Sequence, residues 1–171
     1  MKSFSLTTAL TASTLALSLA CAPATMAKPK NRTQDAQTNT VTGGTSGGVI
    51  GRDVTATTSG TGTSIVGPNG LRGTAITGTA DATAENGEVT TRSDARSNDR
   101  RAMQKSSATA VTDEERARSR TRTMVTPNQV VRSRTTATYK ADGEKPIRET
   151  VSTITCADGT VVDKMAGCKR R

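Results

Sequence analysis

The chain has 171 residues, a net charge of +9 and a hydrophobic content of only 32%. It contains no histidine, which excludes histidine-based acid–base catalysis and histidine metal ligands. Large apolar side chains offset the entropy of ordering a chain. Because few are present, we expect a mostly β protein with little core and extensive disorder.

Residues 1–27 have the features of a secretory signal peptide. Lys2 supplies a positive charge, an uncharged apolar run covers residues 4–20, and small residues continue to Ala27. We expect cleavage after Ala27, or after one of two earlier alanines, and export to the periplasm or the cell exterior. After cleavage no apolar run is left that is long enough to span a membrane.

Cys21 suggests an alternative, a lipoprotein anchored through this residue. The bacterial lipid-attachment motif places leucine three residues before the cysteine, whereas Leu17 and Leu19 lie four and two residues before it. We therefore expect that Cys21 is removed together with the signal peptide.

Positive charge is concentrated in the second half of the remaining chain. Loss of Lys2 with the signal peptide leaves +8, and residues 28–90 contain five basic and five acidic side chains. All of the net charge therefore lies after Thr90. This asymmetry predicts an anionic partner for the second half.

Residues 28–48 are polar and end in a glycine-rich stretch, so we expect a flexible linker there. Residues 49–140 contain short runs of threonine, valine, isoleucine and alanine separated by turn signals, which predicts a meander of antiparallel strands. The turn signals are Ser59-Gly60, Gly67-Pro68-Asn69-Gly70, Glu85-Asn86-Gly87, Asn98-Asp99, Pro127-Asn128, Asp142-Gly143 and Asp158-Gly159.

Two short helices are alternatives to strands within this region, at residues 97–105 and 112–122. Thr112 followed by Glu115 is typical of a helix capping box. A helix here would have no apolar stripe to hold it against a body. We therefore predict a strand from Arg116 to Val125.

The C-terminal segment, residues 141–171, is predicted to form a hairpin closed by a disulfide. Asp158-Gly159 between β-branched residues favours a two-residue type I′ turn, which would bring Cys156 toward Cys168 if residues 165–167 turn the chain back. A disulfide across this loop would contribute about 3 kcal/mol. Two thiols without histidine are too few for a metal site, so no metal or cofactor is expected.

The C-x-D-G-T pattern with a second cysteine downstream resembles the C-terminal tails of small uncharacterised exported bacterial proteins. The resemblance covers only this tail. It implies an envelope or secreted protein and says nothing about activity.

An alternation of arginines is the strongest candidate for a binding site. Alternate residues of a strand share one face, so arginines at every second position would form a row. If the loop at residues 127–129 has three residues, Arg122 lies opposite Arg134 and the whole set shares one face; an even loop divides it between two faces. The six arginines are Arg116, Arg118, Arg120, Arg122, Arg132 and Arg134.

Such a row suits phosphate or carboxylate groups, because guanidinium binds both through paired hydrogen bonds. Expected partners are lipopolysaccharide phosphate, acidic polysaccharide or extracellular nucleic acid, although stacking aromatic residues are missing. Two alternatives stay open: a charged face that only keeps the protein soluble, and a structural protein whose threonine-rich strands assemble with other chains.

Other patterns point to no activity. Thr-x-Thr triplets, such as Thr55/Thr57 and Thr77/Thr79, resemble the ice-binding face of β-solenoid antifreeze proteins, but their spacing is uneven. Nucleophile and phosphate-loop motifs are absent, and the carboxylates of residues 113–115 lie beside arginines and are expected to form ion pairs or to cap the chain. We therefore predict a non-enzymatic protein without catalytic residues.

Overall fold

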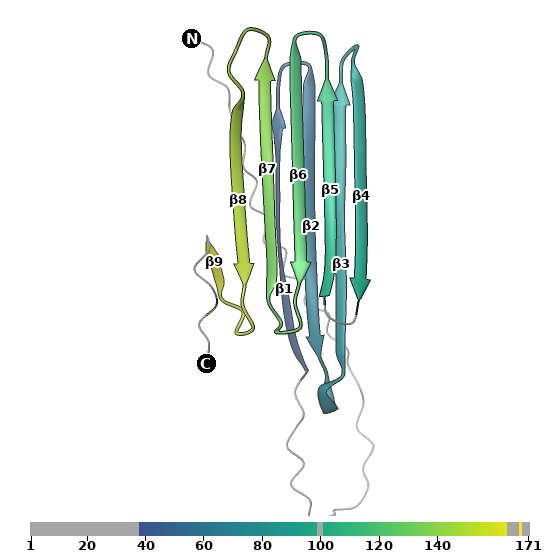
Figure 1. The fold of residues 1–171 in the computed structure, drawn as a ribbon, viewed down its shortest axis with the longest axis vertical. Coiled ribbons are helices and arrows are strands. Elements are labelled where there is room, and N and C mark those ends of the chain that lie inside the picture. Colours follow the sequence, from purple (N-terminus) through teal and green to yellow (C-terminus); the bar gives the residue numbers. More distant parts are fainter. Residues whose placement is uncertain (1–37, 99–100, 164–167, 169–171) are drawn as a thin grey trace, which may run out of the picture.

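The computed structural model describes residues 38–98, 101–163 and 168, and shows two stacked antiparallel sheets (Figure 1). The predicted mostly β meander is confirmed. The signal peptide, Cys21 and the first part of the predicted linker lie outside the described residues.

The smaller sheet has three strands in sequence order, and the larger has six, also in sequence order. The three-stranded sheet contains β1 (Asn39–Ile50), β2 (Val54–Val66) and β3 (Arg72–Ala84), with a 3-10 turn (Pro68–Gly70) between the last two. The six-stranded sheet contains β4 (Glu88–Asn98), β5 (Arg101–Val111), β6 (Glu115–Val125), β7 (Val131–Ala141), β8 (Ile147–Thr155) and β9 (Val161–Asp163).

The smaller sheet lies over the middle of the larger one. Its strands β3, β2 and β1 pack against β5, β6 and β7 respectively. The chain passes from one sheet to the other at Glu85-Asn86-Gly87, one of the predicted turns, where Asn86 has a φ of 52°. Asparagine tolerates this left-handed conformation better than most residues.

The space between the sheets is filled by small side chains from every second residue. Along β6 the inward-facing residues run from Ala117 through Ser119, Thr121 and Thr123 to Val125. Apolar clusters therefore form at the two ends, and hydroxyl groups occupy the middle. One cluster includes Val54, Ala110, Ala117 and Tyr139, and the other consists of Val41, Ala102, Val125 and Val131.

The buried hydroxyl groups satisfy one another. Thr58 bonds to Ser119 at 2.6 Å and to Thr121 at 2.8 Å, which links the two sheets. Within the larger sheet, Thr121 bonds to Thr135 at 2.6 Å. Because a buried polar group is costly only when unpaired, threonine can here replace larger apolar residues. This is how a chain with so few large apolar residues builds an interior.

The prediction of a turn at Ser59-Gly60 is wrong, because both residues lie inside β2. The buried side chain of Gln104 lies against Gly60 and Gly78, where a β-carbon would overlap it. The glycines therefore serve close packing between the sheets instead of a turn.

The predicted linker at residues 28–48 is also wrong in its described second part, because β1 begins at Asn39. The inward-facing Gly43 and Gly47 admit the side chains of Thr155 and Thr135 from the larger sheet. Glycine gives no local strand signal, so packing against the facing sheet decides this conformation.

Neither alternative helix forms. Residues 97–98 end β4 and residues 101–105 begin β5, while residues 115–122 belong to β6, as the strand prediction required. The capping-box hydrogen bond is present, from the Glu115 backbone N–H to Oγ1 of Thr112 at 3.0 Å. It closes the turn between β5 and β6 instead of starting a helix.

The disulfide between Cys156 and Cys168 is confirmed, with 5.6 Å between the two Cα atoms. The hairpin between β8 and β9 also forms, but the type I′ turn does not. Only Gly159 has a positive φ, of 80°, and the Cys156 N–H donates to the carbonyl of Thr160 at 2.9 Å. The loop thus has three residues, with glycine in the left-handed position. The predicted turn at residues 165–167 lies outside the described residues.

Candidate anion-binding face

The predicted arginine row lies on the outer face of the six-stranded sheet. Pro127, Asn128 and Gln129 form the three-residue loop, so Val125 pairs with Val131 and Arg122 with Arg134. The three-residue alternative for the loop is therefore confirmed. All six predicted arginines share this face, and Val125, Val131, Ala137 and Tyr139 point into the interior.

Neighbouring strands add basic residues that the sequence pattern did not identify. Strand pairing places them on the same face because directly opposed residues of an antiparallel pair point the same way. With the six arginines they make twelve basic side chains against two acidic ones, Glu88 and Asp94. We call this surface the basic face; its added residues are Arg92, Arg96, Arg101, Lys105, Lys140 and Arg148.

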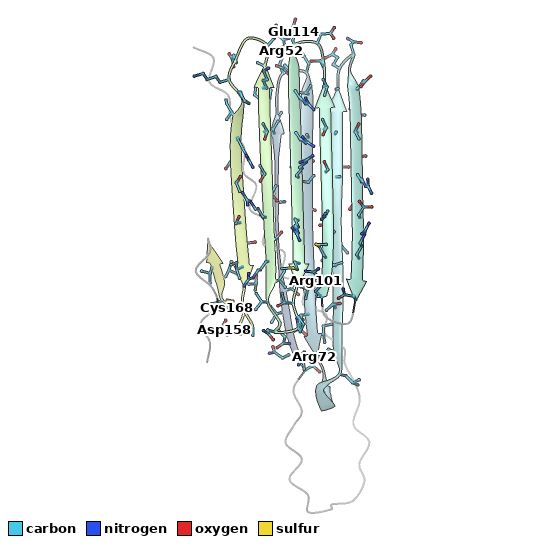
Figure 2. The ribbon with its side chains drawn as sticks, in the orientation of Figure 1. Arg52, Arg72, Arg101, Glu114, Asp158 and Cys168 are labelled. Carbon is cyan, nitrogen blue, oxygen red and sulfur yellow. A yellow bond between two sulfur atoms is a disulfide. The ribbon has the colours of Figure 1, made fainter. Side chains whose placement is uncertain are left out.

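An open groove of about 1380 Å³ runs across the basic face. Side chains from β4 to β8 line it, among them eight arginines and Lys105, and Asp94 is the only acid among the described residues that line it. Figure 2 shows side chains with nitrogen atoms along most of the length of the larger sheet. Asp94 is already engaged by Arg92, Nε to Oδ2 at 2.6 Å.

Most of this charge has no internal counterion. Among the described residues, none of the six predicted arginines forms a salt bridge. Arg118 is half-buried, and its Nε is enclosed yet has no hydrogen-bond acceptor in the described part of the chain. Arg122 and Arg134 are directly opposed like charges, which is unfavourable unless solvent or an anion screens them.

The outer face of the smaller sheet is chemically different. Its polar side chains are hydroxyls, and Asp81 is the one charged residue at the outward-facing positions of the three described strands. We call it the hydroxyl face; its residues include Thr40, Thr42, Ser46, Thr55, Thr57, Ser59, Thr61, Thr63, Thr77, Thr79 and Thr83. Three of the Thr-x-Thr triplets lie here, whereas Thr121/Thr123 point inward and Thr136/Thr138 lie on the basic face. The fold is not a solenoid.

The carboxylates of Glu114 and Glu115 hold the end of the sandwich together. Glu115 is buried and accepts hydrogen bonds from the Tyr139 hydroxyl at 2.8 Å and the Asp53 backbone N–H at 3.0 Å. Arg52 lies between Asp53 and Glu114, and hydrogen bonds to both raise the pKa of its guanidinium (Figure 2). Burial and the bond to Glu115 raise the pKa of Tyr139 to about 12. These residues tie the β1–β2 turn to the larger sheet.

Within the described ranges, no three acidic or cysteine side chains gather as a metal-ion site would require. Nor does the described part of the chain contain a helix of the length and apolarity needed to cross a membrane. Comparisons with protein-family models, curated proteins and solved structures give no match to this chain.

Proposed function

We propose that this protein is a non-enzymatic exported protein that binds anionic envelope polymers through the basic face. The observation that carries the proposal is the segregation of charge: twelve basic and two acidic side chains on one face of the described sheet. The expected ligands are phosphate-bearing lipopolysaccharide, acidic polysaccharide or extracellular nucleic acid.

The physical reason is the release of counterions. A cluster of fixed positive charges without internal partners concentrates small anions, and a polyanion displaces them with a gain in entropy. Recognition would depend on charge and spacing, since Tyr139 is buried and no other aromatic residue is among those described. Base stacking is therefore not part of the proposal.

Export is supported by the pattern of residues 1–27 and by the disulfide between Cys156 and Cys168. Disulfides persist mainly in oxidising compartments such as the periplasm. Phosphate-rich and acidic polymers are abundant on that side of the membrane, which agrees with a basic binding face.

Assembly with other chains is the second candidate, and the edge of the larger sheet favours it. Strand β4 is eleven residues long and has no neighbour on its outer side within the described residues. Its Val89 is 52% exposed. However, Arg92, Asp94 and Arg96 on this strand are the kind of charges that protect an edge from pairing. We therefore favour polymer binding.

Salt-dependent binding tests the proposal. Heparin and inorganic polyphosphate should bind the full chain, and affinity should fall linearly with salt on logarithmic axes. Replacing Arg122 and Arg134 with Gln should reduce the slope by about two units, one for each lost contact. Replacing Arg72 and Lys145, which lie off the basic face, removes the same charge and should change the slope less. Absence of binding, or equal losses in the two variants, would contradict the proposal.

A further inference from the structure

The centre of the basic face differs from its ends in what surrounds the arginines. Strand pairing places Arg118 between Thr109 and Thr138. Arg120 lies between Ser107 and Thr136 in the same way. Each of these two arginines therefore has a hydroxyl-bearing residue on both sides.

The outer members of the same row have other neighbours. Arg116 lies between Val111 and Lys140, and Arg122 lies between Lys105 and Arg134. At these positions there are charges but no flanking hydroxyls. The centre of the row therefore offers both guanidinium and hydroxyl donors. At Arg116 and Arg122 no hydroxyl lies beside the guanidinium.

Arg118 supplies an independent sign that an anion belongs there. Its Nε–H is enclosed and has no acceptor among the described residues. A buried donor left unpaired destabilises the folded state. If the Arg118 side chain rotates so that Nε faces solvent, an anion placed side-on against the guanidinium would accept from Nε and one Nη together, as in paired arginine–oxyanion contacts.

We propose that Arg118, Arg120 and the four flanking hydroxyls form a subsite for a tetrahedral oxyanion, a phosphate or sulfate ester carried by a polymer. This inference rests on the proposed function and narrows its ligand. The subsite residues are Arg118, Arg120, Ser107, Thr109, Thr136 and Thr138.

The geometry of the donors favours a tetrahedral acceptor over a planar one. Side chains two residues apart on a strand are about 6.8 Å apart, and directly opposed residues of neighbouring strands are about 5 Å apart. Donors therefore approach the centre from along the strand and from both sides. A carboxylate has two oxygens in one plane, whereas a phosphate or sulfate ester has oxygens that point in several directions. The additional oxygens can accept from the hydroxyls while the guanidinium groups hold the others.

The first experiment compares three polymers of matched length on the full oxidised chain, at one salt concentration. Polyphosphate and heparin carry tetrahedral groups, and polygalacturonate carries carboxylates. We expect the first two to bind at least about tenfold more tightly, a difference of about 1.4 kcal/mol. The difference in affinity between polyphosphate and heparin shows whether phosphate or sulfate is the better ligand. Affinities that rise only with the charge density of the polymer, with no further advantage for phosphate or sulfate groups, would overturn the inference.

Matched variants then locate the preference. Replacing Arg118 and Arg120 with Gln should remove most of the tenfold preference. Replacing Arg116 and Lys140 with Gln removes the same charge from the same face, and should weaken binding to all three polymers while leaving the preference intact. If both double variants lose the preference equally, the subsite is not at the centre of the row.

Hydroxyl replacement tests the subsite without a change of charge. Thr109→Val with Thr138→Val should lower the preference for polyphosphate severalfold and leave the salt slope unchanged. Valine keeps the branched shape that suits a strand. Thr63→Val with Thr79→Val on the hydroxyl face is the control, and melting temperatures show whether each variant is folded.

The outcomes separate the two proposals. If no polymer binds, the proposed function fails and the subsite fails with it. If all polymers bind with the same affinity and the salt slope is steep, the basic face binds polyanions without the proposed subsite. Competition by sodium phosphate that is no stronger than competition by sodium acetate, at equal ionic strength, would overturn the subsite alone.

Discussion

The basic face and the hydroxyl face have the same backbone geometry and opposite chemistry. On the hydroxyl face, side chains bond to each other, as Thr42 does with Thr63 at 3.0 Å and Ser59 with Thr79 at 2.9 Å. On the basic face, the predicted arginines find no salt-bridge partner among the described residues. The basic face has internal contacts at Arg92–Asp94 and Thr136–Thr150, but these leave the six predicted arginines without a counterion in the described part of the chain.

This difference is possible because neither outer face is needed to build the interior. Alternate residues of every strand supply the buried alanine, valine, serine and threonine side chains. The remaining alternate positions are free to carry whatever chemistry a partner requires. Packing of the interior therefore does not require the charge on the larger sheet, which agrees with the proposal that this charge serves binding.

The largest expected effect comes from moving charge between the two faces. Arg118, Arg120 and Arg122 changed to Gln should weaken polyphosphate binding by more than about tenfold, with a salt slope lower by about three units. Adding Thr61→Arg, Thr63→Arg and Thr79→Arg restores the net charge on the hydroxyl face. Isothermal titration should show that affinity stays at least about tenfold below that of the natural chain. Full recovery would mean that net charge alone governs binding.

The next effect concerns the stability that the Cys156–Cys168 disulfide contributes at the β9 edge of the larger sheet. Replacing Cys156 and Cys168 with Ser should lower the free energy of unfolding by about 3 kcal/mol, because the unfolded chain loses a constraint. Urea denaturation measures this. Polyphosphate affinity of the folded variant should be unchanged, since neither cysteine lies in the groove. A loss of affinity would show that the hairpin supports the basic face.

Alkaline pH should lower the stability of the protein through ionisation of Tyr139, which lies in the interior and on neither outer face. The pKa of Tyr139 is raised to about 12, above the value of about 10 expected in an unfolded chain. The neutral phenol is therefore favoured in the folded state, so its contribution to stability is complete below pH 10 and is lost as the pH rises toward 12. Urea denaturation at pH 8, 10 and 11 should show this decline. Tyr139→Phe should be less stable at pH 8 and show a weaker decline above pH 10; an identical decline in both proteins would exclude Tyr139 as its cause.

The smallest effect tests repulsion within the basic face. Arg122 and Arg134 are directly opposed, so Arg134→Gln should raise stability by about 0.2–1 kcal/mol at low ionic strength. Thermal unfolding in 10 mM and 500 mM NaCl measures the gain, which should shrink as salt screens the repulsion. Thr63→Gln on the hydroxyl face is the control, and its stability should show no such salt dependence. A gain that persists at high salt would have a cause other than charge.

Local sequence signals predicted the features that depend on neighbouring residues. The alternation in β6 placed four arginines on one face, whereas the position of Arg132 and Arg134 depended on the loop length, which the sequence left open and the structure shows to be three residues. The pairing of Cys156 with Cys168 depended on their proximity along the chain and on a glycine turn. In each case the partners are joined by one hairpin, so turn chemistry determines the register.

The missed features depend on residues that are distant in the sequence. Arg92 and Arg96 join the basic face only through the pairing of β4 with β5. Gly43 and Gly60 lie in strands because side chains of the facing sheet occupy the space above them. The prediction of a two-residue turn at Asp158-Gly159 was wrong in detail, since only the glycine of this pair adopts a positive φ. No single stretch of sequence contains this information.

The single passage between sheets at Glu85-Asn86-Gly87 has a consequence for how the chain folds. Every strand pairs only with its neighbours in sequence, so each sheet forms from successive hairpins without long loops to close. The one distant event is the docking of the two sheets, where Thr58 meets Ser119 across 61 residues of chain. Contacts of such sequence separation form slowly. We therefore expect hairpin formation to precede a slower docking step, and cleavage of the chain within this turn to leave two fragments able to reassemble without a covalent link.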